Sequence, residues 1–356
     1  MEDVDLHLEP NEASDLCPVF EPDVLDEHGW DRAFVTVLDE ANVERAIALV
    51  VHEGGAAEDA GWSALRVAAK PTVKMKTEDS EACARIDGRV YVLGSQFGKK
   101  SGPLQPKRSF VARIGEEELL RGVDGKKGKL DVAPLRFGLH RAVNEALSDA
   151  GVELLELGPV AREAYIDKTM AKGAKKEKRW DGRIHSSDHP INVEGAEFRT
   201  GGRLLLGLRY PVTAGGDPIL LELEHVDALF DDPDAIPACR NVWVLKGAGT
   251  RDAPVGIRAL HREHGKETFH AIVGNLDSTG KGAAVLEDHP EGGVATSTHI
   301  RFELPAAAGG GDVAVDSLHD FDGLRRIEGI AIGPHGHAHY VIDREGRVDL
   351  RTLALR

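Results

Sequence analysis

Three glutamates occupy matching positions in three similar segments of the sequence. The segments are DSEACARIDGRVYVLGS from Asp79, NVEGAEFRTGGRLLLGLR from Asn192 and RIEGIAIGPHGHAHYVID from Arg326. Each holds a Glu followed by Ala or Gly, a short apolar stretch, a Gly-containing turn and a second apolar stretch. The matching acids are Glu81, Glu194 and Glu328.

If these positions converge in the fold, the three carboxylates form an oxygen-rich cluster with Asp79, Asn192 and either Asp39 or Glu40. Such a cluster suits a hard divalent cation, calcium or magnesium, because carboxylates packed together repel one another without one. The cation could polarise an ester or phosphoryl oxygen and activate water. The structural alternative is that each Glu accepts hydrogen bonds from backbone amides of a neighbouring sheet.

Basic side chains that could hold an anion follow two of these segments. Lys99, Lys100 and Arg108 lie in the stretch GSQFGKKSGPLQPKR, whose prolines restrict the backbone, and Arg209 follows the apolar run LLLGL. Arginine binds a carboxylate or phosphate through two parallel hydrogen bonds. The alternative is an ordinary solvated loop.

Two groups of histidines could contribute further chemistry. His185, Asp188 and His189 precede the second Glu segment and could supply a general base. The alternating His335, His337 and His339 have a spacing that zinc sites use. However, the glycines and the proline around them favour a turn, and surface loops are the commoner setting for histidines.

Apolar stretches of strand length dominate the chain. They are bounded by Gly or Asp and fall at 33–38, 46–51, 90–93, 204–208, 219–223 and 241–245. One helix is predicted after Pro134, because Leu135, Leu139, Val143 and Leu147 recur at near-helical spacing until Gly151. We expect a helical insertion at about 134–151, and the basic segment at about 168–183 favours a surface loop.

The spacing of the three glutamates indicates a repeat architecture. Their separations are 194 − 81 = 113 and 328 − 194 = 134 residues, which fits every second or third unit of a repeat of roughly 40 to 50 residues. A small antiparallel sheet cannot cover both of its faces alone, so radial packing of several sheets is favoured. The prediction is an all-β fold, a single β-propeller domain over 1–356, six-bladed with seven blades possible.

The same segments resemble a known family. The strand pairs containing Glu-Gly, the stretch GSQFGKKSGPLQPKR and the run VEGAEFRTGGRLLLGLRYPV are similar to the bacterial family called domain of unknown function 3616, which is related to esterase-like propellers of the phytase type. The resemblance covers about 15–343. It implies a propeller and supplies no activity.

Composition excludes several classes of protein. The formal net charge is −16, which disfavours binding to nucleic acid. Cys17, Cys83 and Cys239 are far apart and form no disulfide or zinc pattern, and no run approaches the length of a membrane span. These features, with the acidic N-terminus, predict a cytoplasmic protein that does not interact with membranes.

No nucleotide cofactor is expected, because two near-matches to the phosphate-loop motif have the wrong glycine spacing. The two stretches are GSQFGKKS and GNLDSTGK.

Two functions of different kinds follow from the sequence. The first is a metal-assisted hydrolase of a small anionic ester, phosphoester or lactone. The second is a non-catalytic propeller that binds a ligand or a protein partner, since one fold serves many functions.

Overall fold

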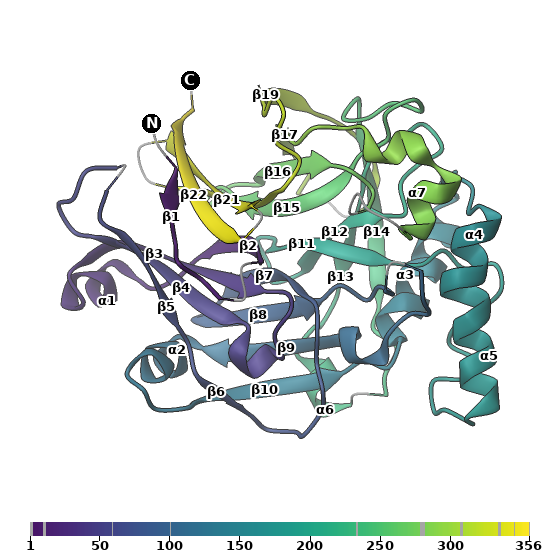
Figure 1. Cartoon of the computed structure of the whole chain (residues 1–356), viewed down its shortest axis with the longest axis horizontal. Coiled ribbons are helices and arrows are strands. Elements are labelled where there is room, and N and C mark those ends of the chain that lie inside the picture. Colours follow the sequence, from purple (N-terminus) through teal and green to yellow (C-terminus); the bar gives the residue numbers. More distant parts are fainter. Residues whose placement is uncertain are drawn as a thin grey trace.

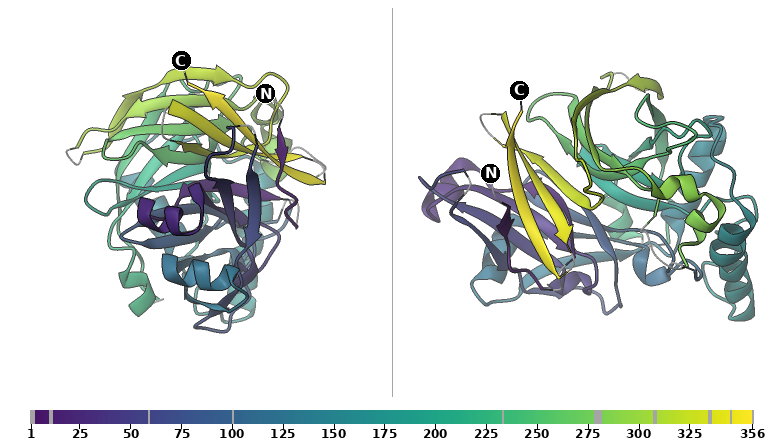
Figure 2. Two further views of the ribbon diagram at one scale, coloured as in Figure 1. Left: turned by 90° about the vertical axis from the view of Figure 1, so that its left-hand side faces the viewer. Right: turned by 45° about the horizontal axis from the view of Figure 1, so that its top comes forward.

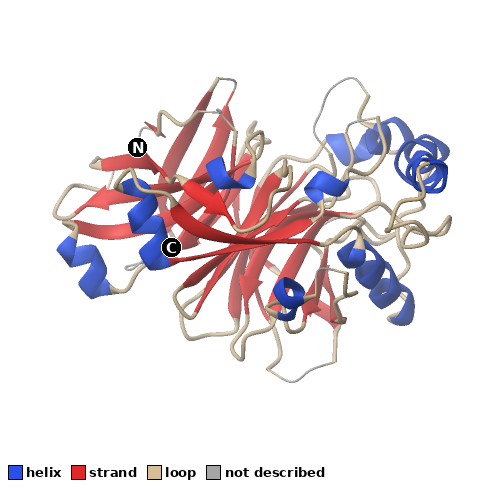
Figure 3. Ribbon diagram, turned by 90° about the horizontal axis from the view of Figure 1, so that it is seen from below, coloured by secondary structure: helices blue, strands red, loops and turns tan. Residues whose placement is uncertain are grey.

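Five sheets account for most of the regular structure, and the fold is all-β, as the sequence predicts (Figure 1). The computed structural model describes residues 3–9, 12–58, 60–99, 101–232, 234–277, 282–306, 309–333, 336–344 and 346–355. Figure 3 shows the helices at the periphery of the strands. Every strand-length stretch singled out from the sequence lies in or largely within a strand.

In each sheet four or three consecutive strands pair in chain order, and in four sheets a further, non-consecutive strand is added at the far edge. The first sheet contains β2 (Ala13–Pro18), β3 (Trp30–Leu38), β4 (Ile47–Glu53) and β5 (Trp62–Arg66). The second contains β7 (Ser80–Ile86), β8 (Arg89–Gly94), β9 (Phe110–Gly115) and β10 (Gly128–Pro134), with β6 (Ala69–Pro71) parallel to β10. The third contains β11 (Asn192–Phe198), β12 (Leu204–Tyr210), β13 (Ile219–Leu223) and β14 (Cys239–Lys246), with β18 (Gly311–Ala314) parallel to β14.

The last two sheets complete the series. The fourth contains β15 (Gly256–Arg262), β16 (Thr268–Gly274), β17 (Thr298–Glu303) and β19 (Asp316–Asp320). The fifth contains β20 (Ile327–Ile332), β21 (His337–Arg344), β22 (Arg347–Ala354) and β1 (Val4–Asp5). The pairing of Val4 with Leu350 joins the two ends of the chain, which lie near one another in Figures 1 and 2.

The first strands of the five sheets contact one another in a closed cycle. β2 contacts β7, β7 contacts β11, β11 contacts β15, β15 contacts β20, and β20 contacts β2. The packing is close where glycines allow it: a Cβ on Gly195 or Gly207 would lie 2.8 or 2.5 Å from the side chain of Ile257 on the next sheet. Residues on these inner strands therefore surround a common centre.

The described residues form five sheets, where the sequence analysis expected six blades. The difference arises because residues 135–191 form helices and loops rather than a sheet. The same insertion accounts for the long separation between Glu81 and Glu194, whose strands β7 and β11 belong to adjacent sheets and not to alternate ones.

The predicted helix is confirmed as α3 (Gly138–Asp149), and Gly151 follows its end with a φ of 64°. The basic segment, expected as a loop, instead contains α5 (Lys168–Lys175), because the chain continues helically from α4 (Pro159–Ala161) through the π-helical turn η3 (Arg162–Asp167). The other helices are α1 (Pro22–Glu27), α2 (Glu116–Val123), α6 (Ala228–Asp231) and α7 (Ala284–Asp288), with short 3-10 turns at Val43–Arg45, Pro106–Arg108 and Pro290–Gly293.

In the described part of the chain, no helix is both long enough and apolar enough to cross a lipid bilayer.

Candidate functional site

Each of the five inner strands has a break in its pairing register near its start. In four of them a single ionisable residue is passed over: Glu81 in β7, Glu194 in β11, Arg258 in β15 and Glu328 in β20. A β-bulge of this kind re-aims a side chain away from the regular alternation of the strand. The repeated Glu positions of the sequence are therefore bulge positions that face the centre of the molecule.

The fifth break, in β2, passes over Asp15 and Leu16, and Asp15 shows the structural alternative. The Asp15 carboxylate accepts hydrogen bonds from the backbone N–H groups of Leu16 and Cys83 at 3.0 and 2.9 Å. At this one position the acid serves to join two sheets through backbone amides.

A cavity of about 690 Å³ lies where the bulges converge. Among its lining residues are ten acids: Glu12, Asp39, Glu40, Glu78, Asp79, Glu81, Glu194, Asp277, Glu328 and Asp343. Six basic residues line it as well: Lys99, Arg108, Arg209, Arg258, Arg325 and Arg326. The structure thus brings together all three repeated glutamates, Asp79, Asn192 and three of the four basic candidates, while Lys100 lies outside the described residues.

Arg258 occupies the position in β15 that Glu holds in the three similar segments. Its guanidinium Nε lies 3.0 Å from Glu194 Oε2 and donates to Glu328 Oε2 at 2.9 Å, and its Nη2 donates to Glu328 Oε1. The side chain is 6% exposed. One buried guanidinium therefore neutralises two of the three glutamates.

Arg209 holds the other oxygen of Glu194. Its Nη1 donates to Glu194 Oε1 at 2.6 Å, its Nε donates to the carbonyl of Asn275 at 2.9 Å, and the Asn192 amide donates to the same Glu194 oxygen at 3.0 Å. A Cβ on Gly256 would lie 2.0 Å from the Arg209 carbonyl oxygen, so the arginine can sit here only because the next sheet has a glycine.

Glu81 has no arginine partner among the described residues and accepts only a hydrogen bond from the Ser14 hydroxyl, at 2.9 Å. Burial raises the pKa of Glu81 well above its ordinary value, and repulsion from Glu194, Asp79, Asp39 and Glu328 raises it further. Burial, followed by repulsion from Glu12 and Asp79, raises the pKa of Asp39 to about 9. At this side of the cavity Asp39 therefore keeps its proton at neutral pH, and the protonated form of Glu81 is favoured.

Asp79 lies two residues before Glu81 and has a different environment. Burial raises its pKa, but Arg108 and the Ser95 hydroxyl oppose the effect, and the resulting pKa is about 6. Its Oδ2 lies 2.7 Å from Arg108 Nη1 and accepts from Ser95 Oγ. Asp79 is therefore ionised at neutral pH, whereas the raised pKa of Glu81 favours its protonated form.

Several acceptor oxygens on the cavity residues have no hydrogen-bond partner within the described part of the protein. They are the side-chain oxygens Asn192 Oδ1, Asn275 Oδ1, Asp39 Oδ1 and Asp343 Oδ1. The two asparagines are only 5% and 4% exposed. A buried acceptor without a partner costs about 1–3 kcal/mol, so a ligand that brings hydrogen-bond donors would be stabilised here.

The residues of the predicted cation cluster do not form a ligand set in this arrangement. Among the described residues, no group of three or more His, Cys, Asp or Glu side chains is placed so that it could hold a metal ion. The physical reason is Arg258, which occupies the space between Glu194 and Glu328 and supplies positive charge itself.

His185, Asp188 and His189 do not line the cavity. Asp188 is buried beside α3, where it contacts His140 Nε2 at 3.2 Å and Arg141 Nη1 at 3.0 Å, and His189 Nε2 lies 3.2 Å from the Leu155 carbonyl. They hold the helical insertion together. Of the alternating histidines, His335 lies outside the described residues and His339 is buried against Thr352 at 3.0 Å.

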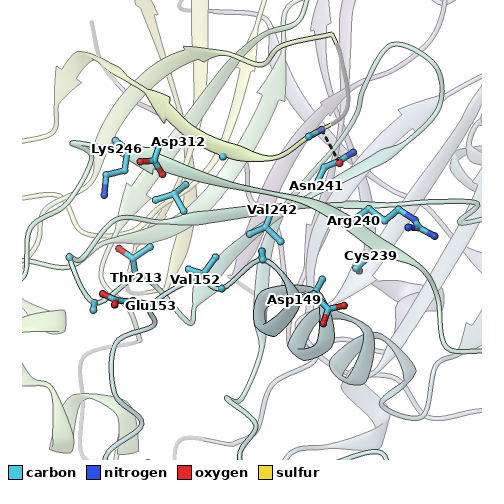
Figure 4. A pocket seen from close by; sticks show the side chains of 18 residues that line it. Asp149, Val152, Glu153, Thr213, Cys239, Arg240, Asn241, Val242, Lys246 and Asp312 are labelled. Atoms are coloured by element: carbon cyan, nitrogen blue, oxygen red, sulfur yellow. Dashed lines mark hydrogen bonds between the residues drawn. The ribbon is translucent and has the colours of Figure 1, made fainter.

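A second cavity, of about 660 Å³, lies between α3 and the strands β14 and β18. Figure 4 shows Asp149, Glu153, Arg240, Lys246 and Asp312 around it. Burial raises the pKa of its Cys239 thiol to about 12, so this thiol is not a nucleophile at neutral pH. This cavity holds none of the site residues predicted from the sequence.

Comparison with known proteins gives limited information. No family model and no curated protein matches the sequence. Among solved structures, an exo-1,5-α-L-arabinanase from a bovine ruminal metagenomic library is 12% identical, with 98% of this chain and 92% of that chain covered and a TM-score of 0.39. A glucose dehydrogenase is 12% identical, with 98% and 85% covered and a TM-score of 0.35. At these TM-scores the similarities carry no conclusion about activity.

Proposed function

We propose that the chain is a β-propeller whose central cavity hydrolyses a small ester or lactone that carries hydroxyl groups. The observation that supports this function is the contrast between two carboxyl groups two residues apart in the same cavity. The pKa of Glu81 is raised well above its ordinary value by burial and by neighbouring carboxylates, whereas Asp79, with a pKa of about 6, is ionised at neutral pH. Two acids with pKa values pushed apart by their environments are typical of acid–base catalysis.

In this proposal, Asp79 removes a proton from water while the water oxygen attacks the carbonyl carbon of the substrate. Glu81 donates its proton to the leaving alkoxide oxygen as the C–O bond breaks, which yields a carboxylic acid and an alcohol. Exchange with solvent then returns the two protons to their starting places. Arg108, which contacts Asp79 at 2.7 Å, keeps the base ionised.

The lining favours a substrate rich in hydrogen-bond donors. The unpartnered oxygens of Asn192, Asn275 and Asp39 can accept from hydroxyl groups. The arginines deep in the cavity are already paired with carboxylates, so they are less available to an anion than the sequence analysis expected. Lys99 and Arg325 are exposed, and they could contact an anionic group only at the mouth.

The test is a screen of hydroxylated esters and sugar lactones with the wild type and the variants Glu81→Gln and Asp79→Asn. The control is Glu163→Gln, because the Glu163 side chain is 72% exposed and does not line the cavity. We expect Glu81→Gln to lower kcat by about 10²-fold or more while substrate binding persists, and the control to be unchanged. Equal turnover by Glu81→Gln and the wild type would contradict the proposal. Binding without turnover across the whole panel would favour a non-catalytic ligand-binding propeller.

A further inference from the structure

A third cavity, of about 720 Å³, forms a groove on the outer side of the second sheet and combines an apolar floor with a basic rim. Val73, Met75 and Val132 contribute to the floor. Its basic residues are Lys74, Lys76, Lys107, Arg136, Lys178 and Arg179. No Asp or Glu in the described ranges lines it, although the whole chain has a formal net charge of −16.

The groove joins segments that are far apart in the sequence. Residues 72–79 connect β6 to β7, Val132 lies in β10, and Lys178 and Arg179 follow α5 at the end of the basic segment that the sequence left unexplained. Figure 1 shows β6, β10 and α6 along the lower edge of the molecule. The basic segment therefore contributes to a defined concave surface.

Half of the basic residues are available to a partner. Lys107 pairs with Glu78, and Arg136 and Arg179 both pair with Asp234. Lys74, Lys76 and Lys178 are exposed and have no ion pair with any described residue. Three unneutralised ammonium groups around an apolar floor attract a ligand that offers carboxylates together with an apolar side chain.

The aromatic residues of the groove do not favour nucleic acid. Trp180 is 5% exposed and packs edge-on against Phe137, with the ring centroids 5.0 Å apart. The Arg113 guanidinium lies over the ring of Phe230 at 4.1 Å. Single-stranded nucleic acid needs open ring faces on which bases can stack, but Trp180 is buried and Arg113 already lies over the ring of Phe230.

We propose that this groove binds an acidic peptide segment of a partner protein, with an apolar side chain of the peptide against Val73 and Met75 and its carboxylates on Lys74, Lys76 and Lys178. Val73 is 41% exposed, one of the few large apolar side chains on the described surface with that much exposure. The peptide would cover it. The proposal does not depend on the hydrolase activity of the central cavity.

The test uses a fluorescently labelled synthetic peptide of alternating Glu and Leu and measures its binding to the whole chain by anisotropy at low and high salt. The variant is Lys74→Glu/Lys76→Glu. The matched control is Lys126→Glu/Lys127→Glu, which reverses two exposed lysines in the turn before β10, away from the groove. We expect the groove variant to bind about tenfold more weakly, because it loses two charge contacts and gains two repulsive ones, and we expect the control to keep its affinity.

A second variant, Val73→Ser, tests the apolar contact without changing charge, and we expect it to weaken binding as well. Absence of peptide binding by the wild type would overturn the proposal, as would equal binding by the groove variant and its control. A single-stranded oligonucleotide that binds the groove more tightly than the peptide would overturn it in favour of nucleic acid.

Discussion

Replacement of Arg258 by methionine removes the guanidinium that holds Glu194 and Glu328 while keeping a side chain of similar length. Arg258 is 6% exposed and makes close contacts with both carboxylates. Loss of one partner from a buried ion pair costs about 3–5 kcal/mol, because the remaining charge stays buried without compensation. Here two carboxylates lose a shared partner, although Arg209 still contacts Glu194 at 2.6 Å.

The assay is thermal unfolding of the wild type and Arg258→Met at neutral pH. We expect the variant to lose about 3 kcal/mol or more of unfolding free energy. The triple variant Arg258→Met/Glu194→Gln/Glu328→Gln should recover most of the stability, since it removes the unpaired charges.

The matched control is Arg301→Met, which breaks the pair with Asp316 on a side chain that is 45% exposed and should cost less than about 1 kcal/mol. Two results would refute the reasoning. One is a loss in Arg258→Met as small as in the control. The other is a triple variant that is no more stable than Arg258→Met.

Three further predictions concern the acids of the central cavity. The pH profile of turnover should be bell-shaped. Turnover should rise as Asp79 ionises through a pKa of about 6 and fall at higher pH as Glu81 loses its proton. A profile that does not rise on the acidic side would contradict the role of Asp79. Because the folded-state pKa of Asp39 is raised to about 9, its contribution to stability is present at low pH and is lost as pH rises toward that value. Asp39→Asn should flatten that decline in unfolding experiments, and an unchanged slope would show that Asp39 ionises freely. Because Arg258 occupies the space between Glu194 and Glu328, calcium or magnesium should leave the Tm of the wild type unchanged at both acidic and alkaline pH. A rise in Tm that Glu81→Gln abolishes would contradict this prediction.

Local patterns in the sequence were sufficient for the strands and for α3, because alternation and near-helical spacing reflect burial directly. The convergence of Glu81, Glu194 and Glu328 could also be predicted, since equivalent positions of packed repeats face a common centre. The number of sheets could not be predicted. The helical insertion between β10 and β11 lengthens the sequence between Glu81 and Glu194, so their spacing does not show that they lie in adjacent sheets.

Arg258 could not be recognised from the three similar segments, because a Glu defines them. The sequence does carry a weaker sign of the equivalence: Arg258-Ala259 in the stretch VGIRAL corresponds to Glu81-Ala82 in the first segment. The raised pKa values of Glu81 and Asp39 could not be predicted from the sequence, because they depend on burial and on neighbours that only the fold brings close.

The most direct test of the central claim, that Glu81 carries the proton donated in catalysis, is an infrared measurement of carboxyl protonation at neutral pH. The difference spectrum between the wild type and Glu81→Gln should contain the C=O stretch of a protonated carboxyl group in the wild type. This band should disappear on titration to high pH together with turnover. A difference spectrum that shows only a carboxylate at neutral pH would contradict the role of Glu81 as the proton donor.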